Sequence, residues 1–266
     1  IEEGFYTIDV KKLRSLISKD TVAILPVHVY GHICDVEKLD RISKEYGIPV
    51  LYDAAHAFGE RYHGRGVGSF GYASMFSFHA TKVFHSIEGG AVCIGEKNPE
   101  LLHKLYALKN FGIMGQESVE LVGCNGKMNE FSAAMGLCNL RHIEEYIKER
   151  EKRYRHYESL LKDVPGLIFP KEQEGVEKNY AYLPVRILGE GRRNQIFSLL
   201  ENEGIHPRKY FYPLISDYDC YKGKFPGDGT PIAKRIAEEI LTLPIYPDLD
   251  FSDIERISVI LQKECS

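Results

Sequence analysis

The stretch Ile48-Pro49-Val50-Leu51-Tyr52-Asp53-Ala54-Ala55-His56 joins an apolar run to an acid and a histidine. An earlier apolar, β-branched run at residues 21–27 is separated from it by a charged segment at residues 35–46. Strand, helix and strand in this order predict a right-handed parallel crossover. Ligands of such α/β folds bind beyond the carboxyl ends of the strands, which is where Asp53 and His56 would lie.

The rest of the chain divides into two predicted units. Apolar segments at residues 72–77 and 91–94 are predicted strands, and residues 99–109 have helical leucine spacing. Residues 129–162 contain no proline and one glycine, which predicts a long helix that bridges two domains. We expect an α/β large domain over residues 1–140 and a smaller α+β domain over 141–266. The elements expected in the second are a strand at 180–187 and helices at 194–203, 231–241 and 254–263.

Composition excludes several classes of partner. The chain has 266 residues and a formal charge of −4, so it offers no basic field for nucleic acid. Six cysteines without a CxxC pair are typical of reduced thiols in a cytoplasmic protein. No apolar run is long enough to cross a membrane, and the first residues lack a signal-peptide pattern. We expect no metal site, because His28 and His32 would lie at a strand end rather than on one helix face.

A second stretch, Ser77-Phe78-His79-Ala80-Thr81-Lys82, places a lysine among hydroxyls. An acid at the end of an apolar strand and such a lysine are what a pyridoxal phosphate site requires. The lysine would bind the cofactor aldehyde as a Schiff base, and the acid would keep the ring nitrogen protonated. A lone loop lysine is usually a solvated charge, and Asp53 alone could be a structural cap. The combination of the two predicts transamination.

The chain resembles the sugar aminotransferases of the DegT/DnrJ/EryC1/StrS family. The resemblance runs along most of the chain. It is carried by Pro26-Val27-His28-Val29-Tyr30-Gly31, Asp53-Ala54-Ala55-His56-Ala57-Phe58-Gly59, the lysine stretch above, Glu88-Gly89-Gly90-Ala91, Gly123-Cys124-Asn125-Gly126-Lys127-Met128-Asn129-Glu130 and Leu243-Pro244-Ile245-Tyr246-Pro247. These enzymes have the aspartate aminotransferase-like fold (fold type I) and aminate keto-sugars carried on nucleotides. The segment Arg208-Lys209-Tyr210-Phe211-Tyr212-Pro213 is most similar to enzymes that aminate C4 of dTDP-4-keto-6-deoxyglucose for surface polysaccharides.

The resemblance implies a role for each matching residue. Lys82 would bind pyridoxal 5′-phosphate and shuttle the proton, and Asp53 would pair with the pyridinium nitrogen. His56 would contact the ring or its phenolic oxygen, and Ser77 would bind the phosphate. Asn125 is similar to the asparagine that reaches the phosphate in a neighbouring subunit, which implies a homodimer with shared sites. Further candidates for binding the nucleotide-sugar substrate or the amino donor are His79, Lys127 and Tyr212.

One departure from the family leaves two alternatives. Members usually carry a further N-terminal segment with a phosphate loop and an aromatic residue that stacks on the cofactor, and this chain begins after both. We therefore expect either an aminotransferase with an N-terminally truncated large domain and glutamate as donor, or a shortened, non-catalytic partner of an intact homologue. Lys82 favours the enzyme, because dehydratases of the family have histidine there. The sequence leaves open the exact sugar, the donor and the choice between C3 and C4.

Overall fold

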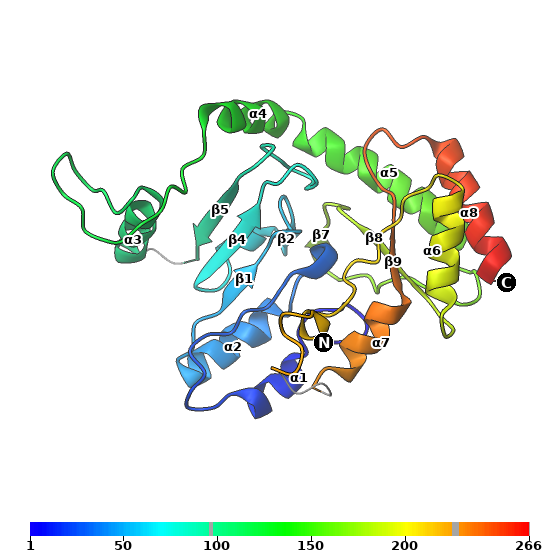
Figure 1. Ribbon diagram of the computed structural model, residues 1–266, viewed down its shortest axis with the longest axis horizontal. Coiled ribbons are helices and arrows are strands. Elements are labelled where there is room, and N and C mark those ends of the chain that lie inside the picture. The colour runs from blue at the N-terminus through cyan, green and yellow to red at the C-terminus, as the bar shows by residue number, and fades with distance from the viewer. Residues whose placement is uncertain (96–97, 225–228, 266) are drawn as a thin grey trace.

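The computed structural model describes residues 1–95, 98–224 and 229–265. Figure 1 shows a first unit around one sheet, a second unit around another, and an arm that projects from the first. The first sheet has the order β1-β4-β5, with β1 parallel to β4 and β4 antiparallel to β5. Its strands are β1 (Leu51–Asp53), β4 (Ala73–Ser77) and β5 (Gly90–Ile94).

The expected parallel crossover is present, although its first segment is not a regular strand. Ile24 and Val27 form isolated parallel bridges with Val50 and Asp53. Pro26 lies between them and has no N–H to donate, so the ladder is interrupted there. The crossover helix α2 (Val36–Tyr46) begins at Asp35, whose side chain accepts from Lys38 N, and ends at Gly47 in the left-handed region. Its apolar face buries Val36, Leu39 and Ile42 against the sheet.

The second unit is an antiparallel sheet covered by helices. Its order is β6-β8-β9, and α5, α6 and α8 surround it in Figure 1. The sheet and these helices share a core of buried leucine, isoleucine, valine and tyrosine side chains from residues 154–265. The elements are α5 (Ile143–Leu161), β6 (Leu167–Ile168), β8 (Leu183–Ile187), α6 (Arg192–Asn202), α7 (Pro231–Glu239), β9 (Ile240–Leu243) and α8 (Phe251–Cys265).

A small third sheet connects the two units. The hairpin strands β2 (Arg61–Tyr62) and β3 (Arg65–Gly66) pair with β7 (Val176–Glu177), a strand that comes just before the second unit's central strand. The Gln173 side chain exchanges two hydrogen bonds with the backbone of Ile33, of 2.9 and 2.7 Å. The segment before β8 is therefore fixed to the first unit. The remaining elements are α1 (Val10–Leu13), α3 (Pro99–Lys109), α4 (Glu130–Leu140) and the 3₁₀ turns η1 (Arg14–Leu16), η2 (Val29–Gly31), η3 (Val67–Ser69) and η4 (Ile215–Asp217).

Two predicted elements are wrong at their boundaries. The single helix expected over residues 129–162 is divided into α4 and α5, with Arg141 and His142 between them. The two helices have different partners, since α4 contacts the lysine loop, where Asn139 donates to His85 O at 2.9 Å, and α5 packs on α8. The helix predicted over 231–241 ends at Glu239, because the fully buried run that follows pairs with β8 as β9.

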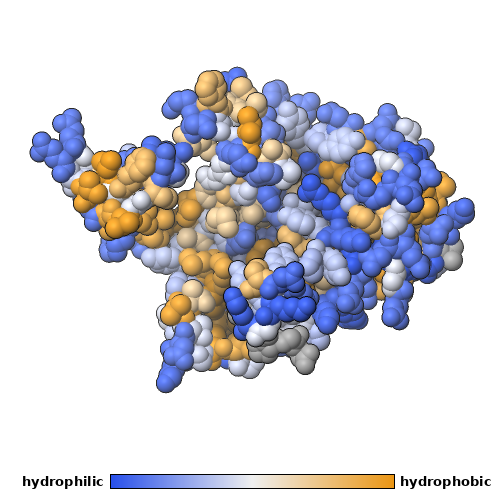
Figure 2. All heavy atoms as spheres, viewed as in Figure 1, coloured by the Kyte–Doolittle hydropathy of each residue, from blue (hydrophilic) through white to orange (hydrophobic). Residues whose placement is uncertain are grey.

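The arm consists of α3 and the loop after it, and it carries many exposed apolar side chains (Figure 2). More of them lie on α4. The exposed apolar residues of these two segments are Leu102, Tyr106, Leu108, Phe111, Ile113, Val119, Val122, Phe131, Met135, Leu137 and Leu140. Within the described ranges, no helix is long and apolar enough to span a membrane.

Candidate active site

Asp53 is the last residue of β1, and the turn after it is tightly held. Its backbone N–H donates to Pro26 O and its carbonyl accepts from His28 N, both at 2.9 Å. The carboxylate Oδ1 accepts from Ala55 N at 3.0 Å, so the side chain is oriented by its own turn. A carboxylate at the carboxyl end of a strand in an α/β sheet is well placed to meet a ligand.

Lys82 lies in the loop that joins β4 to β5. Phe78 N–H donates to Gly89 O and Lys82 N–H donates to His79 O, which fixes the loop beyond the carboxyl end of β4. The lysine is half-buried, and this burial lowers the pKa of its ammonium group; the negative charge of Asp53 opposes the shift and Arg208 adds to it. The structure therefore brings Asp53 and Lys82 into one electrostatic environment at neighbouring strand ends.

His56 is held as a neutral hydrogen-bond donor. Tyr30 N–H donates to His56 Nδ1 at 3.0 Å, so the ring proton must be on Nε2. Burial, assisted by the charge of Lys82, lowers the pKa of His56 to about 3. The imidazole thus presents an uncharged N–H to the site at any neutral pH.

Two residues behind the site hold the turn that carries His56. Asn179, only 1% exposed, donates through Nδ2 to His56 O at 2.8 Å and to Phe58 O at 3.0 Å. Its backbone N–H donates to Glu60 Oε1 at 3.3 Å, and the other Glu60 oxygen is buried without a partner among the described residues. Complete burial raises the pKa of Glu60 well above its usual value, which favours the protonated form of this carboxyl. Asn179 therefore couples the approach to β8 with the catalytic turn.

A group of aromatic side chains that was not predicted from the sequence surrounds His56. The ring centroids of Tyr182 and Phe211 lie 4.5 and 5.7 Å from that of the imidazole, and Tyr210 lies at 5.8 Å. Tyr30 donates through its hydroxyl to Tyr210 O. The rings come from the second unit and from η2, far apart in the sequence.

The other predicted residues are divided between the lysine loop, the arm and the second unit. Ser77 ends β4, and its hydroxyl accepts from His79 N at 3.4 Å, so both lie near Lys82. Asn125 and Lys127 are in the arm and bond to each other at 2.9 Å. Tyr212 lies under the guanidinium of Arg193, 4.6 Å from the ring centroid, rather than against His56. Among the described contacts, the structure does not join the arm pair or Tyr212 to Asp53 or Lys82.

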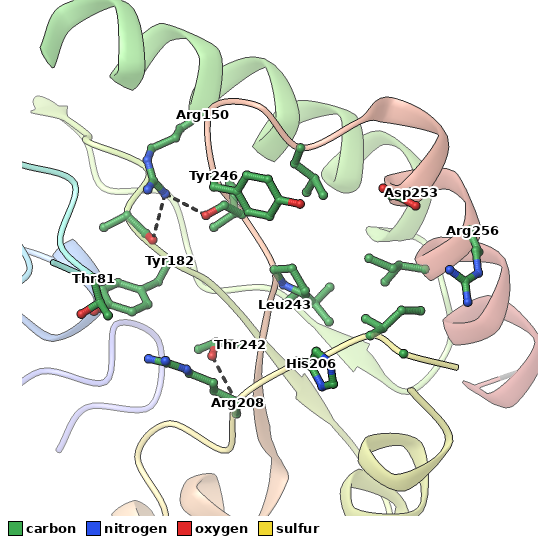
Figure 3. Close-up of a pocket in the computed structure, with 17 residues that line it drawn as sticks. Thr81, Arg150, Tyr182, His206, Arg208, Thr242, Leu243, Tyr246, Asp253 and Arg256 are labelled. Carbon is green, nitrogen blue, oxygen red and sulfur yellow. Dashed lines mark hydrogen bonds between the residues drawn. The ribbon is translucent and has the colours of Figure 1, made fainter. Parts of the chain in front are cut away.

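The donor set fits pyridoxal phosphate. Asp53 can accept the proton of a pyridine nitrogen, His56 Nε2 can donate to a phenolic oxygen, and Lys82 can bind an aldehyde. The hydroxyl of Ser77, at the end of β4, and that of Thr81, in the lysine loop, could donate to a phosphate. A cavity of about 500 Å³ begins at Thr81 and continues between β9, α8 and the segment around Arg208 (Figure 3).

Comparisons with known proteins agree with this geometry. Residues 1–262 match the DegT/DnrJ/EryC1/StrS aminotransferase family. The chain belongs to that family. It is 38% identical to the dTDP-4-amino-4,6-dideoxy-D-glucose transaminase of Escherichia coli, over 98% of this chain and 71% of the relative. The Shigella dysenteriae transaminase of the same name is 36% identical, over 93% of this chain and 67% of the relative.

The solved structures confirm the fold. That of DesI with its TDP-sugar product superposes with a TM-score of 0.91 at 32% identity, covering 99% of this chain and 67% of DesI. The family resemblance and the aspartate aminotransferase-like α/β fold are therefore confirmed. Pyridoxal phosphate, predicted from Asp53 and Lys82, is confirmed as the cofactor of the family. Family membership favours an enzyme over the non-catalytic alternative.

Replacing His56 with glutamine is expected to leave the shape of the pH–rate profile unchanged between about pH 5 and 8. The reason is that His56 is already neutral there and acts only as an N–H donor, which a glutamine amide can replace. Steady-state rates of both proteins across this range test the expectation. If the wild type shows an acidic limb near the usual histidine pKa, and glutamine removes that limb, His56 titrates and the assignment is wrong.

Replacing Glu60 with glutamine is expected to stabilise the protein, increasingly so at higher pH. A carboxyl whose pKa is raised on folding costs stability as the pH rises above its unfolded value, by up to about 1.4 kcal/mol per pH unit. Glutamine does not titrate, and its Oε1 can still accept from Asn179 N. Unfolding temperatures at several pH values test this, with the exposed Glu177→Gln as matched control. A Glu60→Gln protein that is equally destabilised at every pH would show that Glu60 is ionised.

Proposed function

We propose that this protein transfers an amino group to a keto-deoxysugar nucleotide of the dTDP-4-keto-6-deoxyglucose type, with glutamate as the amino donor. The observation that carries the proposal is the meeting of Asp53, His56 and Lys82 beyond the ends of β1 and β4. The named activities of the two relatives that are 38% and 36% identical support the sugar class. We place the reaction in the cytoplasm.

Each residue has a chemical task in this reaction. Bound pyridoxal phosphate supplies an electron sink that makes a proton on the substrate's amino-bearing carbon acidic. Asp53 would hold the proton on the ring nitrogen and so would maintain the positive charge that the electron sink needs. His56 Nε2 donates to the phenolic oxygen. Lys82 Nζ would hold the aldehyde of the bound cofactor, and as a free amine it would carry the proton to and from the substrate carbon.

Further roles follow from the positions of the remaining predicted residues. Ser77 is proposed to bind the phosphate, because its hydroxyl ends the strand that leads into the lysine loop. His79, whose Nδ1 lies 3.0 Å from Thr81 Oγ1, is proposed to meet the substrate beside Lys82. Tyr212 is proposed to contact the sugar nucleotide from the second unit. The division into domains at residues 1–140 and 141–266 is also proposed, and the two separate hydrophobic cores support it.

A homodimer with shared sites is proposed as the working form. The exposed apolar side chains of the arm and α4 (Figure 2) would be covered by a second copy. Asn125 and Lys127 lie on that arm, so they would reach the partner's cofactor and substrate. Light scattering of the purified protein tests this. A monomer at micromolar concentration would contradict the proposal, and Phe131→Asp, on the exposed face of α4, should weaken a dimer.

One experiment tests the function directly. The protein is mixed with pyridoxal phosphate, its absorbance spectrum is recorded before and after borohydride reduction, and the adduct is located by peptide mass mapping. An adduct on Lys82, followed by amine transfer from glutamate to the keto-sugar nucleotide, is the expected result. No adduct, or an adduct only on exposed lysines, would favour the non-catalytic alternative.

A further inference from the structure

Arg208 is a cation beside Lys82 that has no carboxylate partner among the described residues. Its backbone is fixed by the edge of the second sheet, where it exchanges hydrogen bonds of 3.0 and 2.8 Å with Thr242. Its charge lowers the pKa of Lys82, and also acts on the phenols of Tyr182 and Tyr210. Arg208 lines one cavity together with Thr81 and Tyr182, and Figure 3 shows its guanidinium on the same side of the cavity as Thr81, the residue before Lys82.

Arg150 is a second cation without a carboxylate partner in the described part of the chain. It is 9% exposed, and within the described residues its Nη1 donates to two backbone oxygens, those of Ile245 at 2.9 Å and Ala181 at 3.5 Å. Its Nε is buried and has no hydrogen-bond partner among residues 1–95, 98–224 and 229–265. A buried cation that is bonded only to carbonyls is costly, and a nearby anion would offset that cost.

Both arginines line the cavity that begins at Thr81. Figure 3 shows their guanidinium groups on the same side, with the Tyr182 ring between them and Thr81 next to it. The carboxylate in the cavity wall, Asp253, lies at the other end near Arg256, which is itself paired with Glu203 at 3.3 Å. Among the residues that line the cavity, the end at Thr81 therefore has the two cations and no carboxylate.

We propose that Arg208 binds the α-carboxylate of the amino donor, an inference that rests on the proposed function. In an α-amino acid a single carbon separates the amine from the carboxylate, so a donor whose amine takes the place of Lys82 Nζ would hold its carboxylate close to that position, on the side where Arg208 lies. In a keto-sugar nucleotide the whole pyranose ring lies between the reacting carbon and the phosphate. A planar guanidinium next to Lys82 matches the carboxylate, which it can bind with two parallel hydrogen bonds.

Arg150 has a supporting part in this site. Its hydrogen bonds join the residue before Tyr182 to the loop after β9, so it fixes the Tyr182 ring that separates it from Arg208. Its charge adds to the positive potential without touching the donor. The 2-oxo acid product keeps the same carboxylate, so it leaves from the same residue before the sugar enters.

The test measures the two half-reactions separately, with Arg208→Gln and Arg208→Lys. Loss of a charged, bidentate hydrogen bond should weaken glutamate in the first half-reaction by about 10- to 100-fold. Arg208→Lys should have an intermediate affinity for glutamate, because lysine keeps the positive charge but cannot make two parallel hydrogen bonds to the carboxylate. The second half-reaction, from the pyridoxamine phosphate form to the keto-sugar nucleotide, should be unchanged.

Lys209→Gln is the matched control. It removes the same charge one residue away, where the ammonium lies over the Phe197 ring at 4.3 Å, and should leave both half-reactions unchanged. Glutarate, which has no amine and cannot react, gives a binding readout through the absorption band of the lysine-bound cofactor. It should saturate the wild type and Lys209→Gln, and bind Arg208→Gln about 10- to 100-fold more weakly.

The outcomes separate this proposal from the proposed function. If Arg208→Gln keeps wild-type affinity for glutamate and glutarate, Arg208 is not the carboxylate site. If it weakens only the sugar nucleotide, Arg208 binds a phosphate and the proposal is equally overturned. If the wild type binds glutarate through Arg208 but never aminates a sugar nucleotide, the carboxylate site stands and the proposed acceptor is wrong.

Discussion

Replacing Lys82 with alanine is expected to abolish amine transfer, with a loss of about 10³-fold or more. The side chain performs two tasks that no neighbour can take over, since it binds the aldehyde and carries the proton. Its surroundings suit both tasks, because burial lowers the pKa of the ammonium and so increases the neutral, nucleophilic form, although the charge of Asp53 opposes this shift. Single-turnover absorbance with glutamate measures the loss.

Arginine at the same position should be equally inactive, because a guanidinium remains charged and cannot attack an aldehyde. Lys152→Ala is the control, since that lysine lies on α5 and forms an exposed pair with Glu149 at 2.6 Å. Circular dichroism of each variant shows whether it is folded. Substantial amine transfer by a folded Lys82→Ala protein would contradict the assignment and require another lysine.

Asp53 and Lys82, the part of the site that was predicted from the sequence, lie at the ends of two strands that are neighbours in one sheet, β1 and β4. Asp53 follows a buried apolar run and Lys82 follows the next strand in the sheet order, so strand topology alone places them together. The second unit's contribution could not be predicted in this way. Tyr182, Tyr210 and Arg208 come from segments that reach the site only through the packing of one unit on the other, and no local periodicity reports such contacts.

Asn179 is a second residue whose contact with the site could not be predicted from local sequence patterns. In the sequence it is one polar residue before a predicted strand, with nothing to distinguish it from a loop residue. In the structure it is almost fully buried and satisfies two carbonyls of the turn that carries His56. The only signal available was its position directly before the alternating run 180–187. The single helix predicted over residues 129–162 was wrong for a related reason, because the division into α4 and α5 depends on which surfaces the two helices contact.

The contacts of Asn179, Tyr182 and Arg208 make the second unit part of the active site. Gln173, β7 and Asn179 attach the segment before β8 to the first unit. Arg208 and Tyr182 lie on the side of the second unit that faces the lysine loop. A change in the packing between the units would therefore alter donor binding and the orientation of His56 together. The site depends on both cores, and this dependence explains why its full outline required the structure.

Replacing Asp53 with asparagine is expected to slow amine transfer by about 10²- to 10³-fold while leaving the cofactor bound. Asparagine keeps the oxygen that accepts from Ala55 N at 3.0 Å, so the turn should remain intact. It has no negative charge, however, and cannot stabilise a protonated ring nitrogen, so the electron sink is weakened. Cofactor titration and single-turnover rates separate the two effects.

A second measurement on the same variant needs no turnover. The charge of Asp53 raises the pKa of Lys82 against the effect of burial, so its removal should lower that pKa further. The pH dependence of Lys82 modification in the cofactor-free protein measures this shift, and Asp40→Asn, in an exposed pair with Lys44, is the control. Near-wild-type rates together with an unshifted Lys82 would show that Asp53 is a structural cap of its turn, and the acid that serves the ring nitrogen would have to be sought elsewhere.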